Sequence, residues 1–125
     1  MKIKSSLLTA VGALALFVLV AFPSSSVPAA GHCYDVDIYY EYGGPTGLLV
    51  DMDCAFPSGA TIYYTTNGTD PTHDQFGNPG PGTLIFYGEI PISSGQCNHF
   101  RAIAWKSGYG NSLHIADDTI CNPPK

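Results

Sequence analysis

The sequence predicts an all-β sandwich of about seven strands, and three observations lead to this fold class. No stretch after residue 30 sustains the 3.6-residue hydrophobic period of a helix. Glycine and proline interrupt the chain roughly every ten residues, as turns do in antiparallel sheets. Between these turns the side chains alternate between apolar and polar, or are β-branched and aromatic, as is typical of strands. Short strands at this spacing favour a sandwich.

The first expected strand is 34–42, where one face is apolar and the other polar. The apolar face holds Tyr34, Val36, Ile38, Tyr40 and Tyr42, and the polar face holds Asp35, Asp37, Tyr39 and Glu41. A glycine-rich turn at 43–47 leads to a second strand at 48–54, in which Val50 and Met52 alternate with aspartates. Further strands are expected at 60–66, 84–87, 89–93, 98–106 and 112–120, with a polar loop at 73–83.

Residues 1–30 have the order of a secretory signal peptide. Lys2 and Lys4 precede an uncharged apolar run at 7–22, which is shorter than the roughly 20 residues of a membrane span. We expect cleavage to leave Ala30 or Gly31 at the new N-terminus. The domain is then 31–125, secreted or otherwise extracytoplasmic, and free of the membrane. An uncleaved N-terminal anchor is the alternative.

The cysteine count and the charge narrow the class of protein further. The four cysteines, Cys33, Cys54, Cys97 and Cys121, all follow the signal segment, and an even number in a small exported domain predicts two disulfides. Their spacing contains no CxxC pair, which disfavours zinc. Ten acidic residues outnumber the basic ones that remain after cleavage. Such a surface repels phosphate backbones and excludes nucleic acid as a partner, whereas a neutral glycan or a cation is compatible with it.

Three segments resemble the immunoglobulin-like domains at the C-terminus of chitobiases and hexosaminidases, and the related fibronectin-type-III-associated modules. They are ATIYYTTNGTDPT at 60–72, YGEIPI at 87–92 and FRAIAWKSGY at 100–109, in the order of the family. The resemblance covers about residues 48–120. It implies an immunoglobulin-like antiparallel β-sandwich and a non-catalytic appendage of carbohydrate-active or surface proteins. The four cysteines depart from the family pattern.

Strand direction in such a sandwich chooses the disulfide pairing. Cys33 opens the first strand and Cys54 closes the second, so their hairpin brings both to one end. Cys97 and Cys121 flank the hairpin near Tyr109 in the same way, at the opposite end. A bridge across the two ends would exceed the roughly 7 Å that a disulfide allows between Cα atoms. We therefore predict Cys33–Cys54 and Cys97–Cys121.

No catalytic centre is recognisable, and we expect no enzyme. The chain has no Gly-x-Ser-x-Gly motif, and its four histidines share no ligand spacing. Carboxylates on the outer face of a small sandwich have no deep cleft that would raise the pKa of a catalytic acid. We interpret Asn67-Gly68 and Asp70-Pro71 as turn residues rather than a ligand site.

The acidic face of the first hairpin is a candidate cation site. Pairing about Pro45 places Asp37 opposite Asp53, with Asp35 and Asp51 nearby. Like charges directly opposite one another destabilise a sheet, and calcium with oxygen ligands would relieve the repulsion. The alternative is a solvated acidic face that needs no cofactor.

The aromatic residues supply a candidate ligand site. Tyr39 and Trp105 could form a platform that stacks on sugar rings, and Arg101 shares the strand face of Trp105. Alternatively, Trp105 fills the core of the sandwich. The sequence thus predicts a non-catalytic module that binds chitin or a cell-surface glycan. The alternative is a structural surface subunit or adhesin with a protein partner, added through an edge strand.

Overall fold

The computed structural model describes residues 31–45 and 47–124, which form two antiparallel sheets. The first sheet has the order β2 (Asp37–Glu41), β3 (Leu49–Asp53) and β6 (Ile90–Pro91). The second has the order β5 (Leu84–Ile85), β4 (Thr61–Thr65), β7 (Cys97–Trp105) and β8 (Ala116–Cys121). The prediction of an all-β sandwich is confirmed. The expected signal peptide at 1–30 lies outside the described residues.

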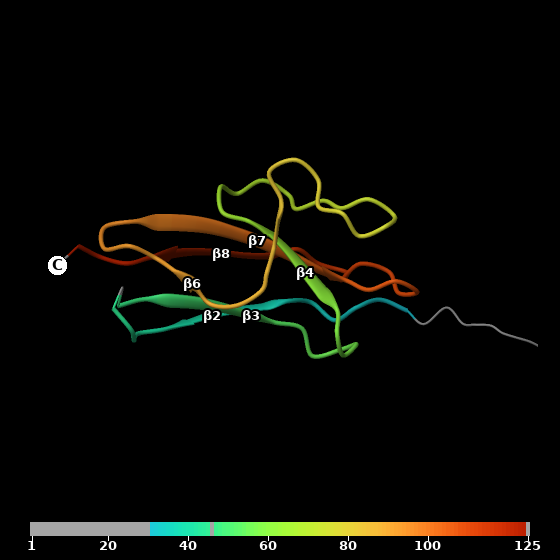
Figure 1. Cartoon of the computed structure of the whole chain (residues 1–125), viewed down its shortest axis with the longest axis horizontal. Helices are drawn as coiled ribbons and strands as arrows, with labels where there is room; N and C mark the ends of the chain where they lie inside the picture. Colours follow the sequence, from blue (N-terminus) through green and yellow to red (C-terminus); the bar gives the residue numbers. More distant parts are fainter. Residues whose placement is uncertain (1–30, 46, 125) are drawn as a thin grey trace, which may run out of the picture. The chain divides into compact units, whose positions relative to one another are not determined.

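The apolar core lies between the two sheets, with β2 and β3 in one layer and β7 and β8 in the other (Figure 1). Both sheets turn alternate side chains inward, as the pleat of a strand requires. The inward set from the paired strands is Val50, Met52, Ile62, Tyr64, Phe100, Ala102, Ala104 and Ile120. The predicted inward direction of Val50 and Met52 is confirmed, since at most 4% of either residue is exposed.

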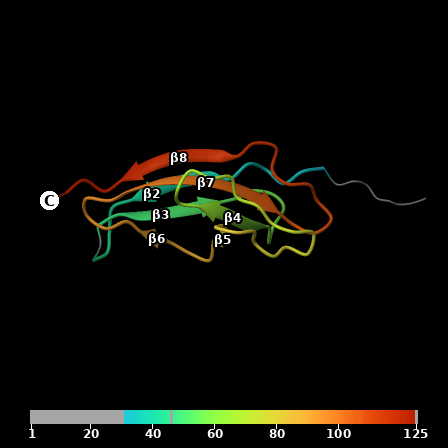
Figure 2. The ribbon, with the colours of Figure 1, turned by 90° about the horizontal axis from the view of Figure 1, so that it is seen from above.

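The first strand is shorter than the alternation predicts, because only Asp37–Glu41 pairs with β3. Val36 is buried, but Tyr40 and Tyr42 on the same nominal face are exposed, Tyr42 by 68%. Their position is consistent with this exposure: β2 is an edge strand, and Tyr42 follows its last residue. Figure 2 shows β2 on the same side as β8, the edge strand of the other sheet.

A long loop at 66–83 crosses the outer face of the four-stranded sheet, on the side away from β2 and β3 (Figure 1). His73 anchors the loop, because its Nε2 lies 2.7 Å from Oδ1 of Asn111 and its Nδ1 lies 2.7 Å from the carbonyl oxygen of Asp74. The hydroxyl of Tyr63 in β4 donates a 2.6 Å hydrogen bond to the carbonyl of Gly77. The outer face of this sheet is therefore covered along β4 and the end of β7.

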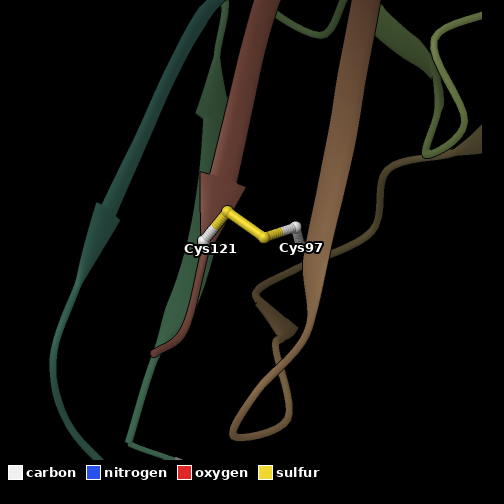
Figure 3. Close-up of a disulfide and its surroundings, with 2 residues drawn as sticks. All are labelled: Cys97 and Cys121. Carbon is white, nitrogen blue, oxygen red and sulfur yellow. A yellow bond between two sulfur atoms is a disulfide. The ribbon is translucent and has the colours of Figure 1, made fainter. Parts of the chain in front are cut away.

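The structure contains one disulfide among its described residues, where the sequence predicted two. Cys97 and Cys121 are directly opposite in the β7–β8 ladder, with Cα atoms 4.0 Å apart (Figure 3). Cys33 and Cys54 are free thiols, so the predicted Cys33–Cys54 bridge is wrong. The hairpin does bring these cysteines to the same end, but both lie beyond the paired residues. The Sγ of Cys54 instead faces the carbonyl oxygens of Tyr34 and Phe56, at 3.4 and 3.2 Å.

The prediction for the last strand also needs correction. The sequence predicted a strand over 112–120, whereas β8 begins at Ala116. The main-chain N–H of Ser112 donates to the carbonyl of Ala104, and that of His114 donates to the carboxylate of Asp35, which lies just before β2. Residues 111–115 thus form a loop at the rim. No helix long and apolar enough for a membrane span occurs between residues 31 and 124, Thr46 left aside.

Candidate binding cleft

An open cleft of about 470 Å³ lies at the rim of the sandwich, beside the start of β2. Its walls come from the segment that precedes β2, from the residue after Cys54, and from the loop before β8. Polar groups are supplied by His32, Asp35, Asp37 and His114, and the remaining lining by Cys33, Tyr34, Ala55 and Leu113. The cleft therefore combines apolar walls with convergent carboxylates and imidazoles, as ligand pockets do.

Main-chain hydrogen bonds fix the segment that forms the middle of the cleft. The N–H of Cys33 donates to the carbonyl of Gly110 at 3.0 Å, and the N–H of Tyr34 donates to the carbonyl of Phe56 at 2.8 Å. His32 adds a contact of 2.9 Å from its Nδ1 to the carbonyl oxygen of Asn111. The segment is held on both sides and presents its side chains at fixed positions.

Asp35 and His114 form a hydrogen-bonded pair in the cleft. Oδ1 of Asp35 accepts the main-chain N–H of His114 at 3.0 Å, and Oδ2 accepts the ring Nδ1–H at 2.8 Å. These hydrogen bonds, the one from the ring first and the one from the main chain second, lower the pKa of Asp35 below its usual value. Asp35 is therefore an ionised carboxylate at neutral pH, oriented by the loop before β8.

Cys33 lines the cleft, but it is buried and its surroundings disfavour the nucleophilic thiolate. Burial raises the pKa of its thiol, and the neighbouring Cys54 raises it further. A reactive cysteine needs surroundings that stabilise the thiolate, and this site does the opposite. The chemistry that the cleft can perform is hydrogen bonding, ion pairing and contact with an apolar ring.

Exposed aromatic rings flank the cleft. Tyr34, which is 59% exposed, packs its ring 5.5 Å from that of Phe56, and Phe56 lies edge-on to Tyr109 at 5.8 Å. Packing against these neighbours limits the freedom of Tyr34 while its outer face stays open. Sequence reasoning placed Tyr34 on the apolar face of the first strand, and it found no signal for Leu113 or His114, because it extended the last strand through them.

The three residues that the sequence suggested for ligand binding lie elsewhere. Tyr39 is half exposed on the outer face of β2, where its hydroxyl donates to Oδ2 of Asp51 at 3.3 Å. Arg101, on the outer face of β7, forms ion pairs with Asp70 and Asp117 at 3.3 and 3.5 Å. Neither contributes to the cleft.

Trp105 occupies a third position that neither alternative foresaw. It lies outside the core, on the outer face of β7, and it is covered by the loop rather than open. His73 is sandwiched between its ring, at 4.7 Å, and that of Tyr63, at 4.8 Å. The loop approaches so closely that a Cβ on Gly77 would lie 2.9 Å from the Trp105 ring. Trp105 thus fastens the loop to the sheet.

The acidic face is only partly assembled as the sequence suggested. Asp37 does face Asp53 in the β2–β3 register, and Asp51 faces Tyr39. Asp35, however, precedes the paired strand and turns to His114. Within residues 31–124, apart from Thr46, no group of three or more His, Cys, Asp or Glu side chains is arranged to hold a metal ion.

Comparison with protein families gives one match, and it agrees with the resemblance seen in the sequence. Residues 43–116 match the chitobiase/beta-hexosaminidase C-terminal domain, with bounds slightly earlier than the segment 48–120. This is an accessory domain, and no catalytic domain is matched beside it. Neither the curated proteins nor the solved structures compared with the chain include a match. The match spans more than half of the sequence, and the chain therefore belongs to the chitobiase/beta-hexosaminidase C-terminal domain family.

Proposed function

We propose that this protein is a secreted, non-catalytic, immunoglobulin-like accessory module that binds carbohydrate of the chitin or cell-surface glycan type in the cleft. The observation that carries the proposal is the cleft of about 470 Å³ with the exposed ring of Tyr34 beside the carboxylates of Asp35 and Asp37. The C–H face of a pyranose packs on an aromatic ring, and its hydroxyls donate to carboxylate oxygens. Export is supported by the Cys97–Cys121 disulfide, since such bonds persist in oxidising compartments.

The proposed site differs from the aromatic platform that the sequence suggested. Trp105 is engaged with His73, and Arg101 is engaged with two carboxylates, so neither side chain is available to a sugar without loss of these contacts. Tyr39 is accessible but lies on the exposed face of β2, outside the cleft. Concave sites bury more of a ligand than flat faces do, which favours the cleft.

The test is titration of the purified protein with N-acetylglucosamine and glucose oligomers, followed by amide NMR shifts and calorimetry. We expect saturable shifts at Tyr34, Asp35 and His114, and loss of binding in Tyr34→Ala. Tyr87→Ala is the matched control, because Tyr87 is an 89% exposed tyrosine that does not line the cleft. Shifts at Tyr39 instead, or none with any oligosaccharide, would refute the proposal.

A structural role with a protein partner is the second candidate, and one observation favours it. Among the described residues, β2 pairs only with β3, so its other main-chain edge is open. The exposed rings of Tyr40 and Tyr42 lie edge-on to each other, with centroids 6.2 Å apart. Asp37 and Glu41 at the ends of β2 oppose indiscriminate strand addition. Size measurement by light scattering would detect assembly, and Tyr40→Pro should abolish it if the edge of β2 is used.

A further inference from the structure

We propose that the cleft selects amino sugars that carry a protonated amine, such as the deacetylated units of an N-acetylglucosamine polymer. The inference rests on the proposed function, because it names the class of sugar for the same cleft. It depends on one side chain in particular, the carboxylate of Asp37, and on the way in which the surrounding charges leave that carboxylate unneutralised.

The first step concerns the two carboxylates of the cleft, which differ in their partners. Both oxygens of Asp35 already accept hydrogen bonds from His114. The side chain of Asp37 has no hydrogen-bond or ion-pair partner within the described part of the chain, although it lines the same cleft. Its nearest partner in register is Asp53, which carries the same charge. Asp37 is thus a negative charge without a counterion in a concave site.

The second step is that, among the described residues, no Lys or Arg side chain pairs with Asp37, and the two histidines of the cleft bind other partners. The structure describes two Lys or Arg residues, neither of them lines the cleft, and both have partners elsewhere. Arg101 binds Asp70 and Asp117, and Nζ of Lys106 donates to the carbonyl of Ser58 at 2.6 Å. A cation from outside the protein would therefore meet an unopposed carboxylate.

The third step concerns the shape and the apolar part of the ligand. Tyr34, Ala55 and Leu113 give the cleft apolar walls, which a bare metal ion cannot use and a sugar ring can. An ammonium group attached to such a ring would place its three donors beside Asp37 while the ring packs on Tyr34. Acetylation would remove the charge and keep the ring. The cleft should therefore distinguish the two forms of one sugar by the charge and the donors of the amine.

The size of the preference follows from the openness of the site. A hydrogen bond to a charged group contributes more than a neutral one, but solvent and salt screen an accessible pair. We expect the glucosamine oligomer to bind roughly tenfold more tightly than the N-acetylglucosamine oligomer of equal length at low salt, with the ratio shrinking at physiological salt. This wild-type comparison needs no substitution.

Two variants show whether the preference for the amine comes from a contact with Asp37 or from the overall negative charge of the domain. Asp37→Asn keeps the size of the side chain, relieves the repulsion with Asp53, and should reduce the tenfold ratio of the two affinities to near unity, whatever it does to the affinity for either sugar alone. Asp53→Asn removes the same charge one strand away, outside the cleft, and should keep most of the preference. Circular dichroism verifies that both variants are folded.

The experiment is calorimetry with the two oligomers and with a lysine oligomer that carries the same number of ammonium groups. Equal affinity for both sugars, or equal effects of the two variants, would overturn the amine selectivity but leave a carbohydrate module. A lysine oligomer that binds in the cleft as tightly as glucosamine would also overturn it, because a basic protein segment would then be the better ligand. Absence of binding to every sugar would refute the proposed function itself.

Discussion

The two ends of the sandwich contain equivalent pairs of cysteines but differ in structure. At one end, Cys97 and Cys121 face each other within the β7–β8 ladder and form a disulfide (Figure 3). At the other, Cys33 precedes β2 and Cys54 follows β3, and the thiols stay free. The cleft opens at this second end, where the chain is held by irregular hydrogen bonds to Gly110 and Phe56.

The difference between the two ends shows that strand pairing determines side-chain partners only within the ladder. Inside a ladder the register fixes which side chains face each other, so the disulfide follows from pairing alone. Beyond the last paired residue, each side chain takes the partner that the local main chain offers. Cys33 and Cys54 have no ladder register to hold them opposite each other, and they stay unbonded. In the same irregular region, Tyr34, Asp35 and His114 come together at the cleft.

The largest effect is expected from removal of the disulfide. Cys97→Ala together with Cys121→Ala should lower the free energy of unfolding by about 3 kcal/mol, because the bond closes a loop with a sequence separation of 24 residues. Cys54→Ala should cost less than about 1 kcal/mol, since its thiol makes only weak hydrogen bonds to two carbonyls. Urea unfolding under non-reducing conditions measures both.

Thiol labelling sharpens this comparison of the two ends. Without a reductant, we expect alkylation at Cys54 first, slower alkylation at the buried Cys33, and none at the other two cysteines. Equal stability losses from both ends, or unlabelled Cys33 and Cys54 in the denatured protein, would show that the cleft end is covalently closed as well.

The next largest effect is expected at Trp105. Trp105→Ala should lower the free energy of unfolding by about 2 to 3 kcal/mol. The substitution removes the half-buried ring on which His73 and the loop at 66–83 pack. Binding in the cleft should be unchanged. Tyr34→Ala should show the reverse pattern, with little loss of stability and loss of the sugar. An effect of Trp105→Ala on sugar affinity equal to that of Tyr34→Ala would contradict the assignment of the site.

A smaller effect is expected from Gly77→Ala, at the closest approach of the loop. Gly77 has a φ of 90°, and a Cβ there would lie 2.9 Å from Trp105 and 3.2 Å from the hydroxyl of Tyr63. We expect a loss of about 2 kcal/mol, of which roughly half comes from the backbone conformation. Gly82→Ala is the matched control, since its φ of 74° carries the same conformational cost and no atom lies within 4 Å. Equal losses would show that the loop does not press on the ring.

The smallest effect concerns the pH dependence of the cleft. Because the folded protein lowers the pKa of Asp35, its stabilising contribution is present above the pKa of the unfolded chain and is lost as the pH falls through the folded pKa. The urea midpoint of the wild type should therefore exceed that of Asp35→Asn at neutral pH, and the two should converge in acid. A difference that persists unchanged at a pH well below the folded pKa would show that the stabilising contribution of Asp35 does not depend on its ionisation.

Within the sheets, the sequence was a good guide. The alternation at Val50 and Met52, the opposition of Asp37 and Asp53, and the pairing of Cys97 with Cys121 follow from a side-chain period of two and antiparallel hairpins. The family resemblance placed the domain class correctly as well. These inferences needed only neighbours along one hairpin.

The sites depended on contacts that no local pattern contains. His114 reaches Asp35 across 79 positions of the chain, and His73 lies between Trp105 and Tyr63 because a loop folds back over the sheet. Sequence reasoning therefore missed the cleft and chose an aromatic residue that the loop covers.

The sequence by itself thus determined the fold class, the register of the hairpins and the acidic charge, because each depends on periodicity or composition. The tertiary structure alone decided which thiols bond, which aromatic rings stay open and which carboxylate remains without a partner. The physical reason is that exposure and charge pairing at the rim depend on which loops pack together, and packing joins residues whose separation in sequence carries no periodic signal.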